Sequence, residues 1–411
     1  MNLLKQARAA KQASIHLRTL SSRGKNEALK SIAEALHHWK EPILARNKRD
    51  VEAMGDSVMA DRLRLTPERI DGIIADLKTV IELPDEVGQV IDERTHPNGM
   101  NIQRVRCPLG VVGMIYESRP NVTVDATVLA LKSGNAIMLK GGSDAIHSNR
   151  ALVEVMKQAL ASTAIPPEAI QFLDTTDRAV TGEFLKLKDY LDVIIPRGGR
   201  GLIDFVSKNA TVPVIATGAS VVHTYVDAAA DLDKAVDIVT NAKTRRVTIC
   251  NALDTVLVHA DVASDFLWKV VAPLKEKKVQ IRCDKRSLKI IGNAGVAAGP
   301  EDFGREFLDY VLSVKVVDSA DEAIAHIEKH SLMHSEAIVT EDAAMAERFL
   351  NEVDAACVYW NASTQFSDGA QFGLGAEIGI STQKLHVRGP FALQGLTSMK
   401  WVVRGEGQVR D

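Results

Sequence analysis

The feature that most constrains the fold of this chain is an alternation of short apolar segments with helical ones. The strand-like segments are residues 110–116, 136–139, 170–173 and 193–195. Helical patterns cover residues 122–132 and 148–160. Apolar runs of this kind are typical of strands buried on both faces. The alternation therefore predicts an α/β fold with a parallel sheet, whose ligands bind beyond the carboxyl ends of the strands.

A second region of the same character occupies about residues 226–363. Its strand-like runs lie near residues 255–258, 314–317, 337–339 and 357–359. Residues 3–83 are helical instead, with a helix start at Thr66-Pro67-Glu68 and a stop at Pro84. Because 411 residues are too many for one simple core, we expect domains at 1–225 and 226–363, and a return of the chain to the first domain over 364–411.

Residues 100–107 alternate polar and apolar side chains between Asn98-Gly99 and Pro108. This pattern predicts an exposed hairpin near residues 97–107 or an edge strand. Near the end of the chain, the sequence MKWVV at 399–403 reads as a strand that pairs with the exposed hairpin of another subunit. The two segments together predict a small β element for oligomerisation.

The composition excludes several classes of function. The chain has 50 basic and 53 acidic residues and a net charge of -3. Non-specific electrostatic binding to nucleic acid or anionic membranes is therefore not expected. No apolar run is long enough to span a bilayer, and no secretory h-region is evident. The four cysteines are widely spaced, which favours a reducing, cytoplasmic setting without a zinc site.

Cys250 is the leading candidate for a reacting group. It follows a loop that carries Lys243, Arg245 and Arg246, and it precedes an apolar, strand-like run. Neighbouring cations stabilise a thiolate, which is the nucleophilic form of cysteine. The alternative is an inert buried thiol, the commoner state of a free cysteine.

Two glycine-rich loops follow strands of the first region and open helices. One is Lys140-Gly141-Gly142-Ser143-Asp144, and the other is Pro196-Arg197-Gly198-Gly199-Arg200-Gly201. Backbone N–H groups in such loops can hold a phosphate or pyrophosphate. Neither loop is a G-x-G-x-x-G fingerprint, and an ordinary strand-to-helix turn explains each loop as well.

Three histidines, His326, His330 and His334, recur at intervals of four residues. On one continuous helix they would share a face, as metal ligands do. A helix end is expected from Ser331 onward, and no cysteine or carboxylate completes the set. We therefore expect no metal site.

The longest motifs resemble one known family. The stretches DRLRLTPERI, CPLGVVGMIYESRPNVTVDATVLALKSGNAIMLKGG, IIPRGGRGL, NAKTRRVTICN and FGLGAEIGISTQKLHVRGP, in this order, are similar to the gamma-glutamyl phosphate reductase family of the aldehyde dehydrogenase superfamily. The resemblance covers essentially the whole chain. It implies an aldehyde dehydrogenase-like fold, with two parallel-sheet α/β domains, an active-site cleft between them and a small β oligomerisation element.

The resemblance implies NADPH-dependent reduction of gamma-glutamyl phosphate to glutamate-5-semialdehyde in proline biosynthesis. Cys250 matches the nucleophile that forms a thioester, and residues 226–363 match the catalytic domain. Asn121 matches a side-chain donor to the oxyanion, although it could simply cap a helix after Pro120. The implied partners are further copies of the chain and, functionally, glutamate 5-kinase.

The resemblance also assigns residues to the cofactor and the substrate. Residues 1–225 match the NADP(H)-binding domain. The matched cofactor residues are Lys140 beside the adenosine ribose, Gly198 and Gly199 under the pyrophosphate, and Glu306 at the nicotinamide ribose. The candidates for binding the substrate's anionic groups are Arg119, Lys384 and Arg388. Each of these charges could equally belong to the solvated or salt-bridged surface.

One departure separates the chain from hydrolytic aldehyde dehydrogenases. Where those enzymes carry a glutamate that activates water, the aligned position here is Ala216. This change favours a reductase, since hydrolysis of the thioester would waste the substrate. Other aldehyde dehydrogenase chemistry, hydrolytic or acylating on coenzyme A, and a non-catalytic nucleotide-binding protein are the alternatives.

Overall fold

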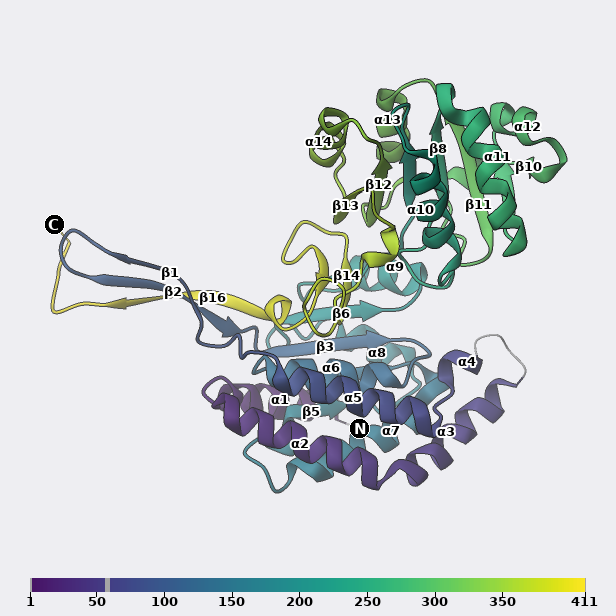
Figure 1. Ribbon diagram of the computed structural model, residues 1–411. Coiled ribbons are helices and arrows are strands. Elements are labelled where there is room, and N and C mark those ends of the chain that lie inside the picture. The colour runs from purple at the N-terminus through teal and green to yellow at the C-terminus, as the bar shows by residue number, and fades with distance from the viewer. Residues whose placement is uncertain (1, 56–59, 411) are drawn as a thin grey trace. The chain divides into compact units, whose positions relative to one another are not determined.

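A computed structural model describes residues 2–55 and 60–410. The chain divides into two compact units: unit 1 is Met1–Thr217, Leu374–Gly379 and Phe391–Asp411, and unit 2 is Gly218–Gly373 and Ile380–Pro390. Each unit contains a parallel sheet with helices packed on it (Figure 1). The predicted α/β class is therefore confirmed.

The unit boundaries differ from those expected from the sequence. The first unit ends at Thr217 and not at residue 225, because β7 (His223–Val226) is hydrogen-bonded to two strands of the unit 2 sheet. The segment 364–411 likewise does not return as one piece, since it is shared between the units. Strand pairing between distant parts of the chain sets both boundaries, and local sequence patterns do not report it.

Unit 1 is built on a four-stranded parallel sheet in the order β5-β4-β3-β6. The strands are β3 (Val111–Tyr116), β4 (Ala136–Gly141), β5 (Ile170–Phe172) and β6 (Val193–Arg197). All residues of β3 and β4 are buried. Continuous burial explains why their sequences are apolar without alternation.

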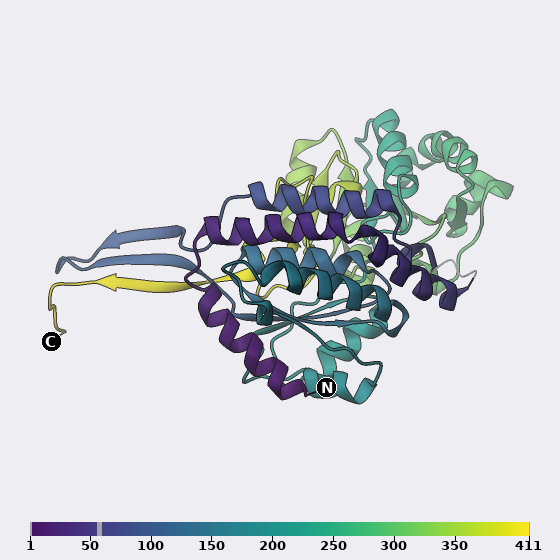
Figure 2. The same cartoon turned by 90° about the horizontal axis from the view of Figure 1, so that it is seen from below.

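The helices of unit 1 form two layers on this sheet. They are α1 (Leu3–Leu17), α2 (Ser22–His38), α3 (Lys40–Met54), α4 (Ala60–Leu63), α5 (Pro67–Glu82), α6 (Asn121–Lys132), α7 (Ile146–Leu160), α8 (Arg178–Phe184) and α9 (Arg200–Asn209), with 3₁₀ turns η1 (Ser143–Ala145), η2 (Pro167–Ala169) and η6 (Gln394–Leu396). Helices α6 and α7 contact the strands, and α2 packs on both of them. Figure 2 shows α2 and α5 side by side. Thr66 caps α5 through the backbone N–H of Arg69, as its sequence predicts.

A second, antiparallel sheet of three strands extends from the rest of unit 1 in both views (Figures 1 and 2). Its strands are β1 (Val90–Thr95), β2 (Asn101–Pro108) and β16 (Thr397–Arg404). β1 and β2 form the predicted hairpin, but β16 pairs with β2 of its own chain. Eight residue pairs from Thr397–Pro108 to Arg404–Asn101 join β16 to β2. Because β16 is an edge strand of this sheet, its pairing with the hairpin of another subunit stays a prediction.

Unit 2 is built on a seven-stranded parallel sheet in the order β10-β9-β11-β8-β7-β12-β13. Besides β7, the strands are β8 (Thr255–His259), β9 (Gln280–Cys283), β10 (Val296–Ala297), β11 (Val311–Val317), β12 (Ser335–Val339) and β13 (Cys357–Trp360). The helices are α10 (Leu232–Thr244), α11 (Ala260–Glu276), α12 (Lys285–Ile291), α13 (Ala320–His330) and α14 (Ala343–Glu352), with 3₁₀ turns η3 (Gly292–Ala294), η4 (Pro300–Gly304) and η5 (Thr364–Phe366). Strands β14 (Gly379–Ser381) and β15 (Gly389–Phe391) form a separate two-stranded sheet.

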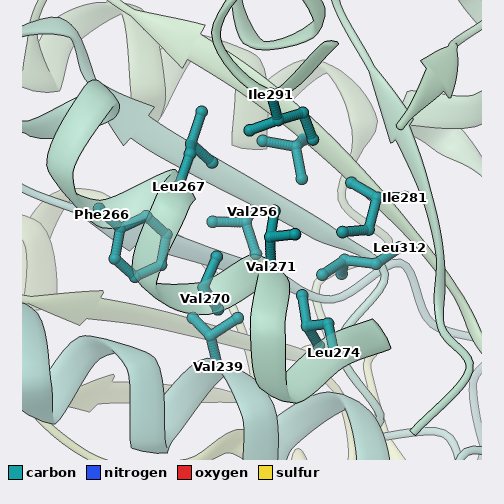
Figure 3. A pocket seen from close by; sticks show the side chains of 11 residues that line it. Val239, Val256, Phe266, Leu267, Val270, Val271, Leu274, Ile281, Ile291 and Leu312 are labelled. Atoms are coloured by element: carbon teal, nitrogen blue, oxygen red, sulfur yellow. The ribbon is translucent and has the colours of Figure 1, made fainter. Parts of the chain in front are cut away.

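The core of unit 2 lies on both faces of its sheet. On one face, Val256 of β8 and Leu312 of β11 pack against α11, while Leu257 of β8 belongs to a second cluster with α13 and α14. Figure 3 shows the first cluster, in which the side chains of α11 meet those of the strands. The space among them does not admit a water molecule. This region is a packed core and not a ligand pocket.

Within residues 2–55 and 60–410, no helix combines the length and the apolar character that crossing a membrane requires.

A buried ion pair supports the helical layer of unit 1 and yields a stability prediction. Lys25 of α2 is fully buried, and its Nζ lies 2.6 Å from Oδ2 of Asp85. The substitution Asp85→Ala leaves the ammonium without its counter-ion, and we expect it to lower the free energy of unfolding by about 3–5 kcal/mol. Urea denaturation followed by circular dichroism measures the change.

The control for this prediction lies on the same helix. Arg23 pairs with Glu27 at the surface, where 87% of the Arg23 side chain is exposed. Arg23→Ala is expected to change the free energy of unfolding by less than about 1 kcal/mol. Equal effects of the two substitutions would contradict the importance of the buried pair.

Candidate active site

The carboxyl edge of the unit 1 sheet brings three loops together. Tyr116 at the end of β3 pairs with Gly141 of β4 on one side and with Arg197 of β6 on the other. The loops that follow these strands therefore begin side by side. They carry the predicted residues Asn121, Lys140 and the Gly198-Gly199 turn, as expected for a parallel sheet.

The Gly198-Gly199 turn holds a carboxylate. The backbone N–H of Gly199, the N-cap residue of α9, donates to Oε2 of Glu117 over 2.8 Å. A Cβ atom on Gly198 would lie 2.4 Å from the same oxygen. The turn thus accommodates an anionic group close to its backbone, which is the chemistry expected of a phosphate site at a helix amino end.

Lys140 lies at the end of β4 and is mostly buried. Its Nζ donates to the carbonyl of Gly141 over 2.8 Å. Burial lowers the pKa of Lys140, and the neighbouring Asp144 opposes this shift. Asp144 also accepts a hydrogen bond from the hydroxyl of Ser118 in the adjacent loop. The ammonium is therefore held at the edge of the sheet, next to the loop after β3.

Asn121 opens α6 but does not cap it, since the N-cap residue is Pro120. Its Nδ2 donates to Oδ2 of Asp125, one helical turn later, over 2.9 Å. The ionised carboxylate can only accept, so in that form Asp125 fixes which end of the amide faces the helix. Burial raises the pKa of Asp125 to about 7. The charge of Asp76 also raises this pKa, whereas the hydrogen bond from Asn121 lowers it. Arg119 is partly exposed just before the helix.

In unit 2, the loop of Cys250 is fixed by polar contacts with the turn η5. Asn251 Nδ2 donates to the carbonyls of Gln365 (3.3 Å) and Ser367 (2.9 Å). The hydroxyl of Thr364 donates to the carbonyl of Asn251 over 2.8 Å. Cys250 itself is partly exposed and forms no disulfide. The thiol therefore stands on a well-supported loop and remains accessible.

Two of the three cations near Cys250 in the sequence bind protein acceptors. Lys243 is fully buried, and its Nζ donates to the carbonyl of Leu253 over 3.0 Å. Burial lowers its pKa to about 8. Arg245 donates to Oε1 of Gln365 over 3.3 Å. These two side chains therefore hold the loop in place. The sequence predicts only that their charges surround the thiol.

Glu306 belongs to the same end of the unit 2 sheet as this loop. Its Oε1 accepts a hydrogen bond from Ser220 Oγ over 3.1 Å. The next residue, Phe307, donates its backbone N–H to Asp254, which follows the loop of Cys250. Asp254 precedes β8 and Phe307 precedes β11, so these residues lie at the amino ends of the two strands.

The proposed substrate residues Lys384 and Arg388 meet one carboxylate. Lys384 Nζ and Arg388 Nη1 each lie 2.6 Å from an oxygen of Asp354. Their hydrogen bonds and charges hold the pKa of Asp354 below its usual range. The structure thus brings these two cations together as an ion-paired group.

The three spaced histidines do not share one helix. α13 ends at His330, as predicted, and His334 is buried beside Ser335 beyond the helix. The rings of His326 and His330 lie 4.5 Å apart. Burial, with the nearby cationic groups, lowers the pKa of His326 to about 2. In the described part of the chain, no three His, Cys, Asp or Glu residues are grouped as metal ligands.

Comparison with known proteins identifies the family. The model of the aldehyde dehydrogenase family matches residues 2–288. The chain belongs to the aldehyde dehydrogenase family. Its two parallel-sheet units are the α/β architecture that this family implies.

Within the aldehyde dehydrogenase family, the chain groups with the gamma-glutamyl phosphate reductases. It is 50% identical to the gamma-glutamyl phosphate reductase of Halalkalibacterium halodurans, with 99% of each sequence covered. It is 49% identical to that of Dehalococcoides mccartyi, covering 100% of this chain and 99% of the relative. The crystal structure of gamma-glutamyl phosphate reductase from Thermotoga maritima superposes with a TM-score of 0.98 at 48% identity, and both chains are covered completely.

Sequence reasoning missed three polar residues of these sites. Glu117 lies directly after β3 and Asp254 directly before β8, and each is a carboxylate next to an apolar run. A carboxylate directly beside an apolar, strand-like run is the sequence signal that could have identified these two residues. Ser220 offers no such signal, because its hydroxyl becomes informative only through its contact with Glu306.

Accessibility predicts which thiols of this aldehyde dehydrogenase react. Cys250 and Cys107 are partly exposed, whereas Cys283 and Cys357 are buried, and burial also raises the pKa of Cys283. We expect iodoacetamide at neutral pH to modify Cys250 at least about tenfold faster than Cys283, because less thiolate is available at Cys283. Peptide mass spectrometry over time measures both rates. In urea the rates should converge; equal rates in the native protein would contradict the structure.

Proposed function

We propose that this chain reduces gamma-glutamyl phosphate to glutamate-5-semialdehyde with NADPH, through a thioester on Cys250, as a step of proline biosynthesis. The observation that carries the proposal is the full-length likeness to curated gamma-glutamyl phosphate reductases at 48–50% identity. The accessible Cys250 on its supported loop agrees with it. Soluble, cytoplasmic action is part of the proposal.

Cys250 performs the covalent steps. Its thiolate attacks the acyl carbon, the C–S bond forms, and the bond to phosphate breaks with departure of inorganic phosphate. NADPH, when bound, supplies the hydride that reduces the thioester carbonyl. The resulting thiohemiacetal expels the Cys250 thiolate and gives the aldehyde. An acyl phosphate is already activated, so covalent capture divides one difficult reduction into two easier steps.

Two donors are proposed for the oxyanion that develops in both steps. One is the backbone N–H of Cys250, and the other is the side-chain amide of Asn121. The hydrogen bond between Asn121 Nδ2 and Asp125 supports this role, because it orients the amide and uses only one of its two N–H groups. Ala216 in place of a water-activating glutamate protects the thioester from hydrolysis.

The residues of unit 1 fit a nicotinamide dinucleotide with a 2′-phosphate. The Gly198-Gly199 turn already accepts the carboxylate of Glu117, so it can accept a phosphate oxygen of the pyrophosphate. Lys140 offers a cation for the 2′-phosphate, and Glu306 of unit 2 offers a carboxylate for the nicotinamide ribose. In the proposal unit 1 binds the phosphates of the cofactor, and unit 2 carries the nucleophile and the ribose carboxylate.

The substrate and assembly proposals rest on exposed or partly exposed groups. Arg119, Lys384 and Arg388 are assigned to the anionic groups of the substrate, with Asp354 holding the last two in place. Homo-oligomer formation is assigned to the three-stranded sheet. Alternate residues of β16 present exposed apolar side chains there, namely Met399, Trp401 and Val403.

The covalent mechanism predicts the response to Cys250→Ala. With glutamate-5-semialdehyde, NADP and phosphate, we expect this variant to lose at least about a thousandfold in kcat, because no other thiol can form the thioester. Cys107→Ala serves as the control, since Cys107 is also partly exposed, and should retain full activity. NADPH absorbance measures the rate, and substantial activity of Cys250→Ala would disprove the thioester.

The same assay separates the reductase from other aldehyde dehydrogenases. Omitting phosphate should abolish NADPH formation by the wild-type enzyme, because the thioester then lacks its acceptor. Coenzyme A should not replace phosphate. Oxidation to free glutamate in phosphate-free buffer would identify a hydrolytic enzyme, and activity with coenzyme A would identify an acylating one.

Lys140 predicts the preference for NADPH over NADH. We expect Lys140→Met to raise the dissociation constant of NADPH at least about tenfold by removing a charge-assisted contact to the 2′-phosphate. The dissociation constant of NADH should change little. Fluorescence titration measures both, with Lys157→Met on α7 as the control for loss of a partly buried lysine. Equal weakening of the two cofactors would refute the assignment.

A further inference from the structure

Asp254 is a buried carboxylate that holds two backbone segments of unit 2. It is 2% exposed and stands between the loop of Cys250 and β8. Its Oδ1 accepts the backbone N–H of Phe307 over 3.0 Å, and its Oδ2 accepts the backbone N–H of Val222 over 3.1 Å. One side chain thus joins three segments that are far apart in the sequence.

The two segments held by Asp254 meet a second time. Ser220, two residues before Val222, donates its hydroxyl to Glu306, which directly precedes Phe307. Asp254, Val222, Ser220, Glu306 and Phe307 therefore form a closed ring of contacts. Within this ring, the carboxylate of Asp254 joins the segment of Glu306 to the loop of Cys250, and a backbone bond from Asp254 N to Val222 O adds to the link.

Several charged groups surround the ring. Lys243, on α10, donates to Leu253 and attracts the charge of Asp254, while Glu306 repels it. Asp309 also attracts Lys243. The guanidinium groups of Arg282 and Arg305 lie 5.4 and 5.9 Å from the ring centroid of Phe307. Among these charges, Lys243 attracts the carboxylate of Asp254 and Glu306 repels it, while Arg282 is paired with Asp302.

We propose that Asp254 is a positioning residue, which places Glu306 for binding the nicotinamide ribose while leaving the reactivity of Cys250 unchanged. This inference rests on the proposed function, because it takes the cofactor and the roles of Glu306 and Cys250 from it. In this role Asp254 does not itself bind the cofactor. It acts through the backbone of residues 306–307.

The ionisation of Asp254 gives the proposal a pH signature. Burial raises the pKa of Asp254 to about 6, with Lys243 and the two backbone N–H groups opposing the shift. Above this pH both oxygens accept; below it, one oxygen carries a proton and accepts poorly. The part of the cofactor affinity that depends on Asp254 is therefore present above about pH 6 and lost as the pH falls through it.

The decisive experiment compares Asp254→Asn with wild type in two measurements on the full-length protein. An amide offers one acceptor where the carboxylate offers two, so one backbone N–H loses its partner. We expect the dissociation constant of NADPH to rise about tenfold at pH 7.5. The rate of Cys250 alkylation by iodoacetamide should change less than about twofold, because the contacts of Asn251 with η5 are untouched.

The pH dependence adds a readout that a general loss of stability would not produce. The phosphate of NADPH itself titrates near pH 6 and affects both proteins equally. The quantity to follow is therefore the dissociation constant of NADPH for Asp254→Asn divided by that for wild type, between pH 5.5 and 7.5. We expect this ratio to approach one at low pH. A ratio that stays constant across the range would overturn the role assigned to the ionised carboxylate.

A matched control is Asp227→Asn. Asp227 is a buried carboxylate of the same unit that binds Tyr225, Ala229 and Thr340, away from the loop of Cys250. The substitution Asp227→Asn should leave the affinity for NADPH unchanged. If Asp254→Asn does not fold, Ser220→Ala removes the hydrogen bond from Ser220 to Glu306 and should weaken NADPH binding about threefold.

The outcomes separate this inference from the proposed function. Normal NADPH binding by Asp254→Asn, or equal losses in NADPH binding and alkylation, would overturn the positioning role. Failure of the wild-type protein to bind NADPH would instead overturn the proposed function. Weakened NADPH binding with unchanged alkylation of Cys250 supports the inference.

Discussion

The arrangement of unit 2 depends on the pairing of buried polar groups at the amino ends of its strands. A buried donor or acceptor without a partner costs free energy, so such groups fix the segments that they join. Asp254, Asn251 and Gln365 make these bonds around the loop of Cys250. The loop is irregular in backbone, but these side-chain bonds fix it, which suits the proposed role of Cys250 as a nucleophile that must meet its substrate in one geometry.

In unit 1 the proposed site depends on a different interaction, the binding of anions by neutral backbone groups. Its parallel strands end side by side, and the loops beyond them present N–H groups and the ammonium of Lys140. In the structure Glu117 takes the position at Gly199 that a phosphate oxygen would fill. The exchange of one anion for another at this turn links the fold of the sheet to the proposed choice of cofactor.

Local patterns predicted most of the secondary structure, because burial imposes a recognisable composition on strands and helices. The runs that became β3, β4, β6 and β8 are continuous and apolar, and α5 carries its own start signal at Thr66. Strands β7 and β9 were missed. In β7 (HTYV) the polar residues are buried only by the surrounding sheet, with His223 bound to Glu336. In β9 (QIRC) only Ile281 and Cys283 are buried, so the apolar signal is too short to indicate a strand.

The sequence by itself determined the α/β class and the family, since these follow from long ordered motifs, and its local chemistry made Cys250 the candidate for the reacting group. The tertiary structure decided the partners. It turned Lys243 inward to Leu253, joined Lys384 and Arg388 through Asp354, and paired β16 with its own hairpin. Such choices depend on which buried donor meets which acceptor across hundreds of residues, and no local pattern records that balance.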